Sequence, residues 1–214
     1  DEDLFVINKP AGLPIHPSQG HYDNTLANGM AWYCAQRGEP FVYRAINRLD
    51  RDTTGLLILA RNSLSAAILS EMVKNRQIHR EYLAVAKGKL PESGVIDAPI
   101  ARVDGSTIER VCDPERGETA VTHYRTFAYN KDADISFIRL LLETGRTHQI
   151  RVHMKAIGHP LPGDFLYCPD YRFIDRQPLH STYLSFSHPV TGEKLEFSAS
   201  LPEDMRKLFP DIKN

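Results

Sequence analysis

The chain has 214 residues, a formal net charge of −1, 42% hydrophobic residues and 25% charged residues. This length can bury a sizeable core, as one large domain or two closely packed halves, and the composition is that of a globular protein. No apolar run approaches the roughly 18 residues that a membrane-spanning helix needs, and the near-zero net charge argues against a protein that binds nucleic acid over its whole surface.

The first 61 residues contain two predicted strands with a helix between them. Residues 4–8 form a short apolar run that ends in "KPAGLP", a Pro/Gly cluster typical of a turn. Residues 24–37 have helical spacing. Residues 55–61, "GLLILAR", are too short for a core helix and apolar on both faces, which predicts a buried strand.

A second helix is predicted over residues 62–75, with Asn62 or Ser63 as its N-cap. Leu64, Ile68 and Met72 fall on one face of this helix and are the expected core contacts.

Residues 80–88, "REYLAVAKG", alternate as a strand does. This pattern places Tyr82, Ala84 and Ala86 on one side and Leu83 and Val85 on the other.

The rest of the chain is rich in predicted strands. Residues 95–143 read as short strands with turns, of which 120–129 and 135–143 are the clearest pair. Residues 147–158 predict a helix capped by Gly158, and "HPVTGEK" predicts a hairpin-like turn between two further strands, followed by a short helix introduced by Pro202. We therefore expect an α+β fold built on a mixed, largely antiparallel central sheet flanked by helices and loops.

Cysteine usage and the chain ends suggest an intracellular setting. Cys34, Cys112 and Cys168 stand far apart without CxxC pairing, which argues against a disulfide framework and against a zinc site. No signal-peptide pattern opens the chain, so a cytoplasmic location is expected by default. The sequence starts at Asp1 and enters a strand at once, so we expect a single domain over 1–214, with an N-terminal RNA-binding domain absent from this chain.

Positive charge is segregated into two groups. Residues 74–89 hold five lysines and arginines against one acid, Glu81. A second group near residue 150 adds three cations to three histidines. Local basic surfaces of this kind suit a polyanionic ligand, although solvated lysine-rich faces explain the pattern about as well.

The stretch "NRLDRDTTGLLILA", residues 47–60, places two acids and two arginines just before the buried strand. Asp50 lies five residues before that strand, and loops at strand ends often hold functional groups. An ionised carboxylate there can act as nucleophile or base if a cation or several donors stabilise it. Taken alone, the pattern favours the ordinary alternative, solvated acids in a surface turn.

The helix predicted over 147–158 carries a cationic face. His148, Arg151 and Lys155 share one side by their spacing, and Ile150, Met154 and Ile157 share the core side. The spacing of five between His148 and His153 does not suit a zinc pair. An arginine on a helix that must also pack suits a buried carboxylate or a phosphate, with a solvated surface arginine as the alternative.

Five segments together resemble the RNA pseudouridine synthases of the RluA type, in order and spacing. They are "NKPAGLPIHP", "NRLDRDTTGLLILAR", "REYLAVAKG", "GRTHQIRVHMKAIGHP" and "HSTYLSFSHPVTGEKLEF", and the likeness runs from Leu4 to about Leu208. The resemblance implies the pseudouridine synthase fold and isomerisation of uridine in ribosomal or transfer RNA. It implies no cofactor and no metal, and we expect a monomer.

The resemblance also implies roles for individual residues. Asp50 corresponds to the nucleophile, Arg151 to the arginine that pairs with it, and Tyr82 to the tyrosine that stacks on the uracil. Arg48 resembles the arginine that intercalates where the target base leaves the RNA stack. Charge and position alone suggest four phosphate contacts: Arg76, Arg80, Lys87 and Arg146.

Two positions depart from the pattern of the family. Asn47 stands where histidine is usual, and Pro162 adds a second proline in "GHPLPGD". Neither residue has a chemical role, so activity is expected while loop geometry or substrate preference can differ.

Two other classes of function lead to different expectations. A non-catalytic RNA-binding module of the same fold predicts loss of Asp50, Tyr82 or Arg151, and all three are present. A glycoside hydrolase needs a second acid across the bond, and Asp52 would point elsewhere on an extended backbone.

Overall fold

The computed structural model describes residues 1–210, and the chain folds into two compact units. The first unit comprises residues 1–79 and 183–199, and the second begins at Arg80 and includes residues 80–182 and 200 onward. Strand β9 begins in the second unit and continues into the first.

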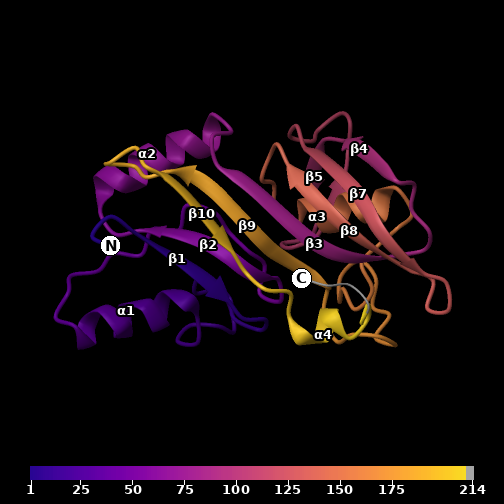
Figure 1. The fold of residues 1–214 in the computed structure, drawn as a ribbon, viewed down its shortest axis with the longest axis horizontal. Helices are drawn as coiled ribbons and strands as arrows, with labels where there is room; N and C mark the ends of the chain where they lie inside the picture. The colour runs from indigo at the N-terminus through magenta and orange to yellow at the C-terminus, as the bar shows by residue number, and fades with distance from the viewer. Residues whose placement is uncertain (211–214) are drawn as a thin grey trace. The chain divides into compact units, whose positions relative to one another are not determined.

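The first unit is a small sheet with one helix on each face (Figure 1). Its strand order is β1-β2-β9, with β10 beside β9, and both the β1–β2 and β9–β10 pairs are antiparallel. The elements are β1 (Leu4–Lys9), α1 (Leu26–Gln36), β2 (Thr54–Ala60), α2 (Ser63–Lys74), β9 (Leu179–Ser187) and β10 (Lys194–Ser198).

Alternation along the strands explains how both helices can pack in this unit. Ile58 of β2 lies in the core cluster that contains Leu69 of α2. On β1, Phe5 points to the other face and meets Tyr33 of α1 with the ring centroids 6.2 Å apart. Every residue of β2 is buried, which confirms the apolar strand predicted over 55–61.

The second unit is an antiparallel sheet with a separate small hairpin. Its strand order is β9-β3-β8-β7-β4, and the hairpin pairs β5 with β6. The elements are β3 (His79–Lys87), β4 (Ser93–Asp97), β5 (Ile100–Arg102), β6 (Arg110–Cys112), β7 (Val121–Asn130), β8 (Ile135–Leu142), α3 (Gln149–Ala156) and α4 (Glu203–Arg206). The expected α+β fold with a largely antiparallel sheet is confirmed.

Several predicted elements match the observed ones closely. The pair predicted over 120–129 and 135–143 is the antiparallel pair β7–β8. The turn "HPVTGEK" joins β9 to β10, and Pro202 is the N-cap of α4. No helix in the described part of the chain is both long and apolar enough to cross a membrane.

The predicted core face of α2 is confirmed for Met72, which packs against the core cluster, and wrong for Leu64. Leu64 is 62% exposed, whereas Ser65 and Leu69 are buried. Ser65 can lie inside because its hydroxyl donates to Asp3 at 2.8 Å, so a polar residue stands in the row that faces the core. Leucine spacing alone cannot identify such a row.

This packing predicts unequal costs for two leucines of the same helix. Leu69→Ala should lower the free energy of unfolding by roughly 2–5 kcal/mol, because Leu69 is fully buried and the truncation leaves a cavity. Leu64→Ala is the matched control and should change it by less than about 0.5 kcal/mol. Urea titration of both variants measures the difference, and equal losses would contradict the observed face.

Candidate active site

The segment 47–53 is a loop at the start of β2, and its two acids lie in different surroundings. Asp52 forms an ion pair with Arg51 at 2.9 Å, which agrees with the structural role predicted for it. The backbone carbonyl of Asp50 accepts from the amide of Thr53 at 3.1 Å, which closes a turn, and Asp50 is half-buried. The turn places the Asp50 carboxylate at the mouth of a fully buried strand.

A buried lysine fixes this loop from the end of β1. The Lys9 ammonium donates to the backbone carbonyls of Pro10, Leu13 and Arg51 at 2.8, 3.0 and 2.7 Å, and Lys9 is 1% exposed. These charge-assisted hydrogen bonds hold the residue next to Asp50. This role could not be predicted from the sequence, because a lysine in a Pro/Gly turn is usually solvated.

Asn47 fixes the other end of the loop. Its side-chain oxygen accepts from the backbone amide of Ile58 in β2 at 2.8 Å, and Asn47 is buried. A histidine ring nitrogen could accept the same hydrogen bond. Asn47 therefore provides the same hydrogen-bond acceptor as the histidine that is usual at this position, and this acceptor ties the loop to β2.

Arg48 is exposed on the same loop and lies near His16. Burial lowers the pKa of His16, and the charge of Arg48 lowers it further. The His16 ring meets Tyr43 edge-on with centroids 5.0 Å apart, and burial raises the pKa of Tyr43 to about 12. Arg48 thus extends into solvent next to uncharged aromatic groups.

In the second unit, Tyr82 and Arg80 lie on the same face of β3. Both are buried, and Tyr82 pairs with Leu140 of β8 in the antiparallel register. Alternation along the strand places their side chains side by side, with one residue between them in sequence.

Arg151 is a buried cation on α3 with a buried carboxylate partner. Its Nε and Nη2 donate to the two oxygens of Asp164 at 2.6 and 2.7 Å, and both side chains are 1% exposed. The guanidinium also lies over the rings of Tyr167 and Phe165, 5.0 and 5.6 Å from their centroids. The solvated-helix alternative is therefore wrong for Arg151.

Asp164, the buried partner of Arg151, is not among the residues predicted from the sequence. Besides its bonds to Arg151, it accepts from the backbone amides of Leu166 and Tyr167 at 3.0 and 3.1 Å. These bonds form a turn that holds the carboxylate in place. The aspartate of "GHPLPGD" was the available signal, but nothing in its spacing connects it to Arg151.

The predicted cationic face of the helix is confirmed around Tyr167. The Tyr167 hydroxyl lies 2.9 Å from Nδ1 of His148, and the Lys155 ammonium lies 5.3 Å from the ring centroid. His148 itself is not helical: it is the N-cap in the left-handed region, with φ 58°, and α3 starts at Gln149. On the opposite side, Ile157 is 36% exposed, so its predicted core position was wrong.

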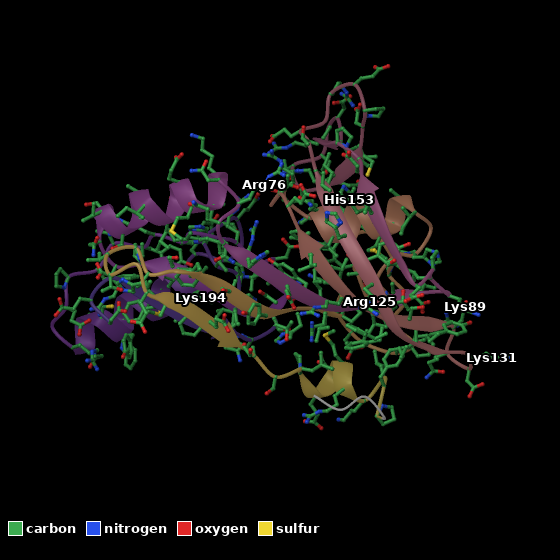
Figure 2. The ribbon with its side chains drawn as sticks, turned by 45° about the horizontal axis from the view of Figure 1, so that its top comes forward. Arg76, Lys89, Arg125, Lys131, His153 and Lys194 are labelled. Atoms are coloured by element: carbon green, nitrogen blue, oxygen red, sulfur yellow. The ribbon has the colours of Figure 1, made fainter. Side chains whose placement is uncertain are left out.

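Two buried polar residues attach α3 to β7. Gln149 donates to the Thr122 hydroxyl at 3.0 Å, and that hydroxyl lies 2.9 Å from Nδ1 of His153. Nε2 of His153 lies 2.9 Å from the Ala98 carbonyl, so it carries the proton and Nδ1 accepts from Thr122. Figure 2 labels His153 in this position. Burial lowers the pKa of His153, which suits a neutral structural histidine.

The five predicted RNA-binding residues fall in both units and differ in their contacts. In the first unit, Arg48 and Arg76 are exposed, and Arg76 follows α2 with φ 58°. In the second, Lys87 pairs with Asp170 at 2.9 Å, and Arg146 pairs with Glu118 and donates to the Thr119 carbonyl. Arg80 is buried.

A grouping of side chains that could hold a metal ion lies in the first unit. Within residues 1–210, Asp1, Asp3 and His188 bring three ligand atoms within 4.8 Å of one another. The Asp1 carboxylate lies 3.1 Å from Nε2 of His188. The Asp3 carboxylate accepts from the Ser65 hydroxyl at 2.8 Å. None of the three belongs to the predicted site.

Comparison with known proteins gives consistent matches. A family model described as RNA pseudouridylate synthase matches residues 3–156. The chain is 41% identical over 209 residues to an uncharacterized RNA pseudouridine synthase of Bacillus subtilis (strain 168), covering 97% of this chain and 69% of that protein. It is also 41% identical over 226 residues to ribosomal large subunit pseudouridine synthase D of Zymomonas mobilis, covering 98% of this chain and 70% of that protein.

Solved structures agree with these matches. Human RNA pseudouridylate synthase domain containing 1 superposes with a TM-score of 0.77 at 26% identity, covering 94% of this chain and 80% of that one.

The buried state of His153 predicts a pH dependence of stability. Its pKa in the folded protein lies below 6.5, so the unfolded chain binds the proton more readily. The stability that His153 contributes is therefore fully present above pH 6.5 and is lost as the pH falls below that value. The free energy of unfolding of the wild type, measured by urea titration from pH 8 to pH 5, should fall more steeply than that of His153→Gln. The two proteins should differ by a constant amount above about pH 7.

A difference between the two proteins that is the same at every pH would contradict this account of His153.

Proposed function

Because the chain belongs to the RNA pseudouridylate synthase family, we propose that Asp50 is the nucleophile with which it isomerises uridine to pseudouridine in RNA. The observation that carries the proposal is the position of Asp50 in a loop fixed from two sides by Lys9 and Asn47. Such a loop holds a carboxylate in one place without removing it from reach.

The reaction breaks the C1′–N1 bond of uridine, turns the uracil and joins it again through C5. Three roles are open to an ionised carboxylate in this sequence: attack on the ribose, attack on the ring, or removal of a ribose proton. All three require Asp50 to be charged, and none requires a cofactor or a metal ion.

Arg151 is proposed to keep Asp50 charged and oriented. The bonds from Nε and Nη2 to Asp164, at 2.6 and 2.7 Å, hold the guanidinium in one direction. A cation beside a carboxylate favours the ionised form, which is the form that the proposed chemistry requires of Asp50.

Tyr82 and Arg48 are proposed to handle the base. The target uridine must leave the RNA stack before its glycosidic bond can be reached. Tyr82 would stack on the uracil and help remove the C5 proton, and the exposed Arg48 would fill the gap left in the RNA. Arg76, Lys87 and Arg146 are proposed to contact phosphates.

Ribosomal or transfer RNA is the proposed substrate class. Relatives named ribosomal large subunit pseudouridine synthase D support the ribosomal alternative. We propose that both units act as one catalytic domain, 1–214, because the family match at 3–156 runs through both. We also propose that the protein acts as a monomer, because the three proposed catalytic residues belong to one chain, and that it works in the cytoplasm, where such RNA is found.

Replacing Asp50 tests the proposal. With transcripts of ribosomal or transfer RNA that carry tritium at uracil C5, the enzyme should release tritium as the new bond forms. Asp50→Asn should lower the release rate by roughly a thousandfold or more, because the variant cannot supply a charged oxygen. Asp52→Asn is the matched control and should stay within a few-fold of the wild type. Equal rates for Asp50→Asn and the wild type would exclude Asp50 as the nucleophile.

A further inference from the structure

Arg80 is a buried cation whose side chain lacks a counter-ion in the described part of the chain. It is 8% exposed, and its Nε has no hydrogen-bond partner. No ion pair joins it to a carboxylate within residues 1–210. Burying a guanidinium without an anion is costly, so a natural chain rarely keeps one without a use.

The other buried arginines of the second unit show the usual arrangement. Arg151 is bound by Asp164 at two atoms, and Arg176 is bound by Asp204 at 2.7 and 2.9 Å. Each is balanced by a carboxylate in a two-point contact. Arg80 has the burial of these residues without the carboxylate.

Gly145 gives the Arg80 guanidinium its space. A Cβ at position 145 would lie 3.0 Å from Nη1 and 3.5 Å from Nη2 of Arg80. The φ of Gly145 is not in the left-handed region, so the backbone there does not itself require glycine. An added Cβ would instead require the guanidinium to shift by a few tenths of an ångström, so glycine leaves room for the observed position of Arg80.

We propose that Arg80 is a buried binding site for a phosphate of the RNA backbone, next to the uracil position at Tyr82. Arg80 and Tyr82 are two residues apart on one face of β3, so their side chains start about 6.6 Å from each other. A flipped nucleotide could thus place its base on Tyr82 and its own or the adjoining phosphate on Arg80. The planar fork of arginine matches two phosphate oxygens.

This inference rests on the proposed function, because it uses the base-stacking role of Tyr82. It goes further because it distinguishes Arg80, a buried arginine without a carboxylate partner, from the other predicted phosphate contacts. Lys87 and Arg146 already have carboxylate partners. An RNA phosphate would supply Arg80 with the anion that the chain does not provide.

Replacing Arg80 with methionine distinguishes a role in RNA binding from a role in the stability of the fold. Removing a buried charge that has no anion should leave the urea midpoint of unfolding unchanged or higher. The KM for tritium-labelled RNA should rise roughly 10- to 100-fold, the effect of one lost charged hydrogen-bond pair. Arg125→Gln removes the same charge from the exposed side of β7, labelled in Figure 2, and should leave KM within about twofold.

Gly145→Ala is the second variant, and it keeps the charge. Its Cβ should displace the guanidinium and raise KM in the same direction, by a smaller factor. A lower urea midpoint for Arg80→Met with an unchanged KM would overturn the proposal, because Arg80 would then be structural.

Nucleotide binding provides a readout that does not depend on turnover. In Asp50→Asn, the NMR signal of the Arg80 Nε–H should shift with uridine 3′- or 5′-monophosphate. It should shift less with inorganic phosphate and stay in place with uridine. No shift with either nucleotide would overturn the phosphate site while leaving the role of Asp50 intact. Conversely, a shift in a protein whose Asp50→Asn variant remains active would support the site and reject the nucleophile.

Discussion

The buried ion pair between Arg151 and Asp164 is the interaction on which the proposed chemistry depends. Both side chains are 1% exposed, so each charge would be costly without the other. The two-point contact, the turn amides that bind Asp164 and the Tyr167 ring fix the direction of the guanidinium. A cation held in this way has a fixed position before any substrate arrives.

The loop that carries Asp50 is fixed by a different means. Lys9 binds three backbone carbonyls at one end, and Asn47 accepts a backbone amide of β2 at the other. Both anchors of the loop therefore bind backbone atoms. Each unit thus presents its functional groups on a rigid support: β2 for Asp50, and α3 with β3 for Arg151 and Tyr82.

The sequence predicted those features that depend on local pattern. The apolar run of β2 and the β7–β8 pair follow from strand alternation and turn residues. What it could not show are contacts between side chains far apart in sequence. Asp164 lies 13 residues beyond Arg151, across a turn whose shape no periodicity encodes. The buried ammonium of Lys9 likewise depends on carbonyls that only the folded turn brings together.

Tritium release by Asp50→Asn, Arg151→Lys and the double variant tests the central claim, that Arg151 acts through Asp50, most directly. The account predicts that the double variant is about as slow as Asp50→Asn alone, because a positioning cation has nothing left to act on. Rate losses that multiply in the double variant would contradict it.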